Sequence, residues 1–144
     1  MRIFIDTSAL VALYHTEPKT RQVEAYAKGA RIFISRVSLL EFRSAIFRLT
    51  RSGVLKQREA GALVEAFRKD LARYTIEEVN QKVWGEALAL IEKHGAKVNL
   101  RSLDALQLAS AKKANARNPI GAFLTLDVHG LAQAAQAEGF TVQP

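Results

Sequence analysis

Cysteine is absent from this chain of 144 residues, which also has only three prolines and eight glycines. Without cysteine there can be no disulfide and no thiolate metal site, and a reducing cytoplasm is the expected location. No apolar run approaches the roughly 18–20 residues that a membrane-spanning helix requires. The segment Met1–Asp6 is too short, and is interrupted by a carboxylate, to be a signal peptide. We therefore expect a cytoplasmic protein with no membrane association.

The composition is typical of a globular protein, with 49% hydrophobic and 24% charged residues. No linker, low-complexity run or internal repeat divides the chain, so we expect a single domain over residues 1–144. The formal net charge of +7 favours a polyanionic partner, either nucleic acid or an anionic membrane surface. A basic surface that only keeps the protein in solution is the alternative.

Short apolar strands are expected to alternate with helices along the chain. Strands are predicted at 1–5, 31–35, 74–76, 122–125 and 140–142. Helices are predicted at 7–13, 19–28, 38–51, 56–71, 80–94 and 103–114, and from Asp127 to about 138. Alternation of this kind predicts an α/β fold, with helices covering a parallel sheet. Thr7 or Ser8, Ser38 with Glu41 as a capping box, and Ser102 are the expected helix caps.

Four acidic residues stand where an active site is expected in such a fold. Asp6 directly follows the first strand, and Asp127 lies just past the strand that ends near Thr125. Glu41 and Asp104 fall in the first turns of predicted helices. In open parallel sheets, ligands bind beyond the carboxyl ends of the strands, so these side chains are expected to meet at one edge. The remaining aspartate, Asp70, is predicted to be a surface residue late in a helix.

A cluster of carboxylates requires a cation, and hard oxygen ligands suit Mg²⁺ or Mn²⁺. Such an ion can activate water and stabilise charge on a phosphodiester, so the pattern indicates metal-assisted phosphodiester hydrolysis. Without the four acids, ten acidic residues would remain against 21 basic ones, which is a charge of +11 on the rest of the chain. The alternative is that each acid only caps a helix. Capping explains Asp6 least well, because a carboxylate after a buried strand costs stability unless it is compensated.

These residues resemble the motifs of the PIN domains. The resemblance is carried by four segments in the family's order: Ile3–Ser8, Ser35–Glu41, Leu103–Ala111 and Phe123–Asp127. It extends over essentially the whole chain. There are two mild departures: Gln107 stands where many relatives carry histidine, and the segment after Asp127 lacks arginines that are common there.

The resemblance implies a three-layer α/β/α sandwich with a mainly parallel sheet. It implies an Mg²⁺- or Mn²⁺-dependent endoribonuclease whose catalytic and metal-binding residues are Asp6, Glu41, Asp104 and Asp127, with Thr7 or Thr125 helping to position the metal or its water. It also implies the toxin of a type II toxin–antitoxin pair of the VapC kind. Such a toxin acts on RNA, forms a homodimer and is silenced by a VapB-type antitoxin protein.

Two other functions remain open. A non-catalytic PIN-like module that binds RNA or a protein partner is consistent with the basic charge. A phosphatase of the haloacid dehalogenase type could use Asp6 as its nucleophile, but Ser8 and Leu10 stand where that mechanism needs an acid and a threonine. No glycine-rich phosphate loop is present.

Other side chains have a functional and a structural interpretation. Five basic residues could steer RNA: Arg43, Arg48, Arg101, Lys112 and Lys113. His129 could bind a metal or substrate, although a surface histidine is the expected interpretation. Trp84 shares a predicted helix face with Leu88 and Ile91, which predicts a core position. Phe42 and Phe47 could lie in the core or in a partner-binding groove.

Overall fold

A five-stranded parallel sheet forms the centre of the molecule in the computed structural model, which describes all residues 1–144. The strands are β1 (Arg2–Ile5), β2 (Arg31–Ser35), β3 (Tyr74–Glu77), β4 (Ala122–Leu124) and β5 (Val142–Gln143). They lie in the order β3-β2-β1-β4-β5, and every neighbouring pair is parallel. The predicted α/β fold with a parallel sheet is confirmed.

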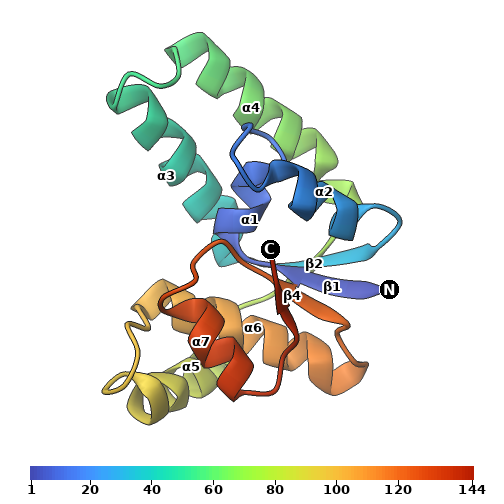
Figure 1. The fold of residues 1–144 in the computed structure, drawn as a ribbon, viewed down its shortest axis with the longest axis vertical. Coiled ribbons are helices and arrows are strands. Elements are labelled where there is room, and N and C mark those ends of the chain that lie inside the picture. Colours follow the sequence, from blue (N-terminus) through green and yellow to red (C-terminus); the bar gives the residue numbers. More distant parts are fainter.

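Helices cover both faces of this sheet. On one face lie α1 (Thr7–Ala12), α2 (Thr20–Ala27), α3 (Val37–Arg51) and α4 (Gln57–Asp70), and on the other α5 (Gln81–His94), α6 (Ser102–Arg117) and α7 (Leu131–Ala137) (Figure 1). A short 3-10 turn (Leu71–Arg73) leads into β3. Each face has its own hydrophobic cluster, so the chain forms the three-layer sandwich that the PIN resemblance implied.

Strand register sorts the apolar side chains onto the two faces. Phe4 of β1 is paired with Phe33 of β2 and with Phe123 of β4, so three phenylalanines cross the sheet on the face covered by α5, α6 and α7. The rings of Phe4 and Phe123 stack with their centroids 5.4 Å apart. The alternate residues Ile3 and Ile5 are fully buried on the opposite face. Because side chains alternate along a strand, the register determines which residues face each layer. It also pairs Ile5 with Leu124, so the carboxyl ends of β1 and β4 lie level with each other.

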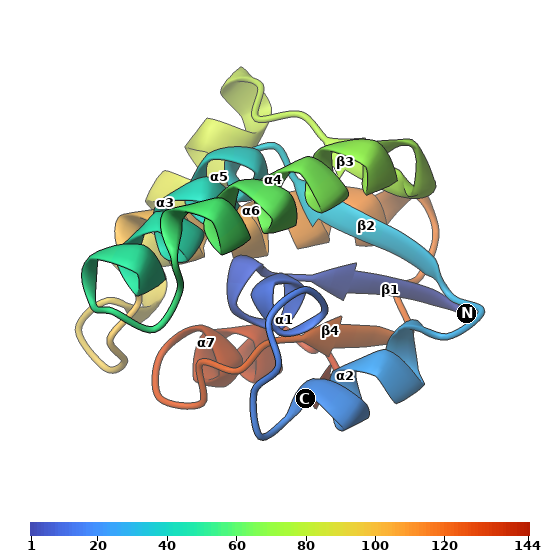
Figure 2. The same ribbon diagram turned by 90° about the horizontal axis from the view of Figure 1, so that it is seen from above.

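Aromatic packing fixes the hairpin formed by α3 and α4, which projects from the sheet in Figure 1 and is seen from above in Figure 2. Phe42 of α3 and Phe67 of α4 lie 4.3 Å apart between ring centroids, and Tyr14 packs edge-on against both. The Tyr14 hydroxyl also donates to Asp70, so Asp70 is half-buried in this cluster and is not a simple surface residue. The packing holds α3, and with it Glu41, against the rest of the molecule.

Strand order places a topological switch point at β1. The chain proceeds from β1 to β2 to β3 in one direction, and then returns to place β4 and β5 on the other side of β1. Connections that leave in opposite directions open a crevice at the carboxyl ends of the two adjacent strands. Asp6 follows β1 and Thr125 follows β4, so both side chains lie at this crevice.

Several predicted helix caps are wrong. Asp6 caps α1 in place of Thr7 or Ser8, and Asp104 reaches back to the backbone of Arg101 at the start of α6, where Ser102 was expected. Helix α3 begins at Val37, so Ser38 lies inside the helix and Glu41 in its second turn, with no capping box. The reason is that β2 turns directly into α3 through Arg36, whose backbone is already helical. Ser38 therefore cannot adopt the extended backbone of a capping residue.

The predicted core position of Trp84 is also wrong. Trp84 is 56% exposed and Leu88 is 55% exposed. The buried stripe of α5 consists of Val83, Ala87, Leu90 and His94, one position before the predicted stripe. The periodicity therefore identified an amphipathic helix correctly, but the buried face begins one residue earlier, with Val83 and Ala87 in place of the larger Trp84 and Leu88. Phe42 is fully buried, whereas Phe47 is 40% exposed.

Glu138, just after α7, ties that helix to α5 and α6 in the same layer. Its carboxylate accepts from Lys93 Nζ at 2.7 Å, from Lys112 Nζ at 2.5 Å and contacts His94 Nε2 at 2.8 Å. Burial raises the pKa of Glu138, but these three donors outweigh it and lower the pKa to about 2. Lys112 also forms an ion pair with Glu86, so its positive charge is neutralised within the protein. None of the helices is both long and apolar enough to cross a membrane.

Candidate active site

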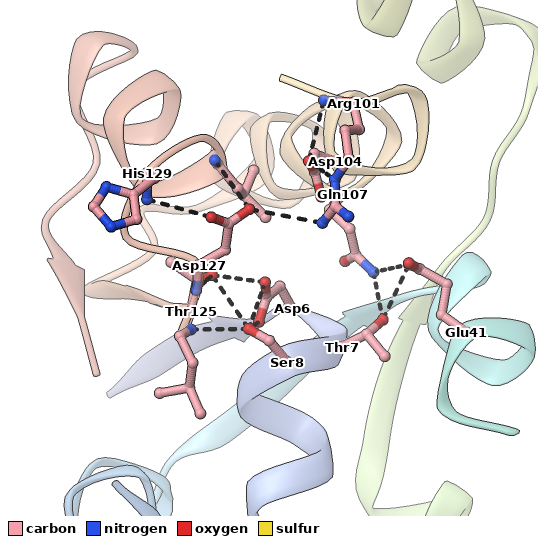
Figure 3. Close-up of polar contacts among 12 residues, drawn as sticks. Asp6, Thr7, Ser8, Glu41, Arg101, Asp104, Gln107, Thr125, Asp127 and His129 are labelled. Carbon is pink, nitrogen blue, oxygen red and sulfur yellow. Dashed lines mark hydrogen bonds and ion pairs between the residues drawn. The ribbon is translucent and has the colours of Figure 1, made fainter. Parts of the chain in front are cut away.

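Asp6 lies at the base of the site, directly after the central strand. Its carboxylate accepts from Ala9 N at 2.9 Å, Ser8 Oγ at 2.7 Å and Thr125 Oγ1 at 2.7 Å (Figure 3). The residue is only 4% exposed. The donors come from α1 and from the end of β4, so Asp6 is oriented by both sides of the crevice.

Burial raises the pKa of Asp6 from its ordinary value of 3.8 to about 6. The bonds from Ala9, Thr125 and Ser8 lower the pKa, and the charge of Glu41 raises it further. Burial raises the pKa more than the hydrogen bonds lower it, because the buried carboxylate has lost the water that would stabilise its charge. Ionisation of Asp6 near neutral pH therefore costs stability, and a nearby cation would offset that cost.

Glu41 is held by a hydrogen-bonded group beneath the crevice. Gln107 Nε2 donates toward Glu41 Oε1, Thr7 Oγ1 and Ser38 Oγ, each at 2.9 Å, and Thr7 Oγ1 donates to Glu41 Oε1 at 3.1 Å. Thr7, Ser38 and Gln107 are buried, and they come from α1, α3 and α6. The group connects three helices and fixes the carboxylate of Glu41 at their meeting point.

Asp104 and Asp127 share one arginine. Arg101 Nε lies 3.2 Å from Asp104 Oδ2, and its NH2 group lies 3.9 Å from Asp127 Oδ2. Hydrogen bonding to Asp104, and then the charges of Asp104, Asp127 and Glu41, raise the pKa of Arg101. Its guanidinium therefore supplies the positive charge that the clustered acids require.

Asp127 lies in the turn between β4 and α7. Its carboxylate accepts weakly from the backbone N–H groups of His129 at 3.3 Å and Leu131 at 3.5 Å. Its own N–H donates to Thr125 Oγ1 at 3.0 Å. The ring of His129 is exposed and points away from the acids in Figure 3, as expected for a surface histidine. Thr125 thus links Asp6 and Asp127.

Gly130 permits the turn that carries Asp127 to pass close to the neighbouring loop. A Cβ atom at this position would lie 2.1 Å from the backbone oxygen of Asn99 and 3.4 Å from Asp127 Oδ2. Because the clash is with backbone, Gly130→Ala is expected to lower the free energy of unfolding by about 1–3 kcal/mol. Urea unfolding measures this change.

Gly61→Ala is the matched control for that measurement. Gly61 lies within α4, and nothing would lie within 4 Å of an added Cβ. Alanine in a helix interior is expected to stabilise the fold by about 0.5–1 kcal/mol. Equal effects of the two substitutions would show that the contact between Gly130 and Asn99 does not matter.

One cavity brings the four acids together. It has a volume of about 780 Å³, and its lining includes Asp6, Glu41, Asp104 and Asp127 together with Arg48 and Arg101. No three acidic or histidine side chains are, however, arranged closely enough to hold a metal ion as they stand. The reason is that Asp104 is turned toward Arg101, and Glu41 toward Gln107 and Thr7.

The donor chemistry of this cavity fits a hard divalent cation. The available ligands are carboxylate and hydroxyl oxygens, which suit Mg²⁺ or Mn²⁺, and neither thiol nor imidazole lines the cavity. In addition, Gln107 Oε1 is buried and has no hydrogen-bond partner. A buried acceptor without a donor is costly, and a cation or a water held by one would satisfy it.

A family model for the PIN domain matches residues 3–136, a range that includes every acid of the cavity. The chain belongs to the PIN domain family. The match confirms the family resemblance carried by the four acidic motifs. Among curated proteins, the chain is 30% identical over 131 residues to "Ribonuclease VapC3" of Pyrobaculum aerophilum, an alignment covering 88% of this chain and 90% of the relative.

Solved structures share the fold of this PIN domain. The toxin VapC20 of Mycobacterium tuberculosis, described as cleaving the sarcin–ricin loop, aligns with a TM-score of 0.69 and 22% identity over 99% of both chains. FitAcB of Neisseria gonorrhoeae aligns with a TM-score of 0.69 and 18% identity, covering 99% of this chain and 96% of the other. At these identities the likeness concerns the fold.

The sequence predictions named the four acids that line this cavity and also Thr7 and Thr125, but missed the support that Ser8 and Gln107 give. Ser8 was considered only as a cap, yet its hydroxyl donates to Asp6 and accepts from Leu126 N at 2.8 Å. Gln107 was noted only as a departure from the family pattern. Of the five basic candidates, Arg48 and Arg101 line the cavity, whereas Arg43 donates to the backbone of Leu39 and Lys113 pairs with Glu77.

Proposed function

We propose that this PIN domain is a divalent-metal-dependent endoribonuclease and the toxin of a type II toxin–antitoxin pair. The observation that carries the proposal is the meeting of Asp6, Glu41, Asp104 and Asp127 in one cavity. These acids come from four separate segments of the chain and gather where β1 and β4 end. If the acids only capped helices, there would be no reason for all four to line one cavity.

Asp6, Glu41, Asp104 and Asp127 are proposed to hold Mg²⁺ or Mn²⁺. When bound, such an ion supplies a Lewis acid that activates water and stabilises the charge of a phosphodiester in its transition state. Ser8 and Thr125 keep Asp6 oriented, and Thr7 with Gln107 keeps Glu41 oriented. These hydrogen bonds restrain the two carboxylates at the wall of the cavity. When the ion binds, Glu41 has to turn from Gln107 and Thr7, and Asp104 has to turn from Arg101.

Basic residues at the cavity are proposed to hold the RNA backbone. The net charge of +7 attracts a polyanion, while the acids confine negative charge to the cavity. Arg48 and Arg101 both line the cavity, and a guanidinium binds a phosphate through two parallel N–H donors. Arg101 must leave Asp104 to reach a phosphate, so binding of a cation and release of Arg101 are expected to occur together.

A VapB-type antitoxin and a second copy of the chain are the proposed protein partners. Helix α3 exposes Leu40 and Phe47, of which Leu40 also lines the cavity. Apolar side chains beside an active site suit a peptide that covers it. The relative VapC3 is named a ribonuclease of the VapC kind, and FitAcB and VapC20 share the fold over nearly their whole length.

Incubation of the antitoxin-free protein with a mixed RNA pool tests the proposed activity. Cleavage is expected with Mg²⁺ or Mn²⁺ and is expected to stop when EDTA is added, whereas single-stranded DNA of the same length remains intact. Internal fragments distinguish an endonuclease from an exonuclease. Metal-independent RNA binding without any cleavage would instead support a non-catalytic PIN-like module.

Growth after induced expression tests the proposed role as a toxin. Expression of the chain alone is expected to arrest growth, and co-expression of a small antitoxin frame from the same operon is expected to restore it. Unimpaired growth in the presence of active enzyme would contradict the toxin assignment but not the ribonuclease assignment.

A further inference from the structure

We propose that Gln107 is a fifth ligand of the cation, donating the neutral oxygen Oε1 beside the four carboxylates. The inference rests on the proposed metal site and extends it. Gln107 is 2% exposed, and its Oε1 is the buried side-chain oxygen in this cavity that has no hydrogen-bond partner. Its side chain projects from α6 into the centre of the site (Figure 3).

The orientation of the amide follows from its neighbours. The amide nitrogen lies 2.9 Å from Glu41 Oε1, and an ionised carboxylate only accepts hydrogen bonds. The group facing Glu41 must therefore be the donor, which directs Oε1 to the other side. Figure 3 shows that side of the amide facing Asp6 and Asp127.

An amide oxygen in this place has no role in the fold that the structure reveals. Protein interiors rarely leave a buried oxygen without a donor, because the loss of its hydrogen bond to water costs about 1–3 kcal/mol. Apolar packing would be served equally well by leucine, and the bond to Glu41 requires only the nitrogen. A cation, or a water that a cation holds, is the partner that explains an unpaired oxygen facing carboxylates.

A neutral ligand also suits the charge of the site. Four carboxylates around one divalent ion leave an excess of negative charge, which Arg101 offsets in the metal-free protein. An amide oxygen adds to the coordination number without adding charge. Mg²⁺ and Mn²⁺ take about six oxygen ligands, and amide carbonyls are among those that hard cations accept.

Titration of the purified protein with Mn²⁺, followed by electron paramagnetic resonance, tests the proposal. Gln107→Leu, which removes Oε1 together with the amide nitrogen that donates to Glu41 and nearly keeps the volume, is expected to weaken Mn²⁺ binding by about 10–100-fold. Thermal unfolding checks that the variant is folded. Ser110→Ala is the matched control, because it removes a buried polar group from the same helix whose bonds go to Ser35 Oγ and Leu106 O, away from the acids, and its Mn²⁺ affinity is expected to change less than threefold.

A double-mutant cycle separates direct ligation from an effect through Glu41. If Gln107 only positions Glu41, Gln107→Leu will not weaken Mn²⁺ binding further in a Glu41→Ala background. Direct ligation predicts a further loss of about the same factor as in the wild-type background. Gln107→His, which replaces the oxygen with imidazole nitrogen, is expected to shift the ratio of affinities from Mn²⁺ toward Zn²⁺.

The outcomes distinguish this proposal from the one it rests on. A wild-type protein that does not bind Mn²⁺ at millimolar concentration would overturn the proposed metal site itself. Wild-type binding with unchanged affinity in Gln107→Leu, or a loss that disappears in the Glu41→Ala background, would overturn only the ligand role of Gln107.

Discussion

Asp104→Asn is expected to lower the rate of RNA cleavage by at least about 10²–10³-fold while the protein remains folded. Asp104 lies in the first turn of α6, where its carboxylate also accepts from the backbone N–H of Arg101 at 3.1 Å. The amide oxygen of asparagine can accept the same bond, so the start of the helix is preserved. What is lost is a negative charge, which a divalent cation needs and a helix cap does not.

Cleavage of a labelled RNA with saturating Mg²⁺, together with thermal unfolding, measures both effects. Asp70→Asn is the matched control, because Asp70 accepts from Tyr14 away from the cavity and its replacement is expected to leave cleavage within about threefold. If Asp104→Asn cut RNA at the wild-type rate, Asp104 would be a helix-capping residue and not a member of the site.

Asp6→Asn is expected to stabilise the metal-free protein near neutral pH by up to about 3 kcal/mol while abolishing cleavage. The pKa of Asp6 is about 6 in the folded chain, and its ordinary value is 3.8. Because the folded state holds the proton more tightly, ionisation of Asp6 favours the unfolded state. This destabilisation develops as the pH rises from about 4 to about 6 and is complete above that range.

Asparagine removes the ionisation and retains an oxygen for the bond from Ala9 N. Urea unfolding in EDTA at pH 4 and pH 7.5 measures the difference between the two proteins, which is expected to be small at pH 4 and largest at pH 7.5. Added Mn²⁺ is expected to stabilise the wild type and not the variant. A variant that is less stable than the wild type at pH 7.5 would show that the hydrogen bonds of Asp6 outweigh the cost of its burial.

Patterns local in the sequence predicted most of the fold. The strands follow from short apolar runs, and these also place Asp6 after a buried strand. The parallel sheet follows from the alternation of strands with helices. Both patterns can be read from neighbouring residues alone. The same reasoning placed Asp127 after β4 and Asp104 in the first turn of α6. The existence of a common edge for these acids follows from the parallel sheet.

Contacts between distant segments account for what the sequence did not reveal. Ser38 has the spacing of a capping residue, but its hydroxyl contacts Thr7 and Gln107, which are 31 and 69 positions away. Trp84 has helical spacing with Leu88, but neighbouring helices determine which stripe of α5 is buried. The unpaired oxygen of Gln107 exists only because α1, α3 and α6 meet, and no spacing along one helix encodes that meeting.

The proposed metal site is tested most directly by the position of Mn²⁺ in crystals of the active protein, located by its anomalous scattering. We expect a peak bound by carboxylate oxygens of Asp6 and its partner acids, with Arg101 turned away from Asp104. A protein that cleaves RNA with no Mn²⁺ at these residues, or that cleaves equally well in EDTA, would contradict the proposed metal site.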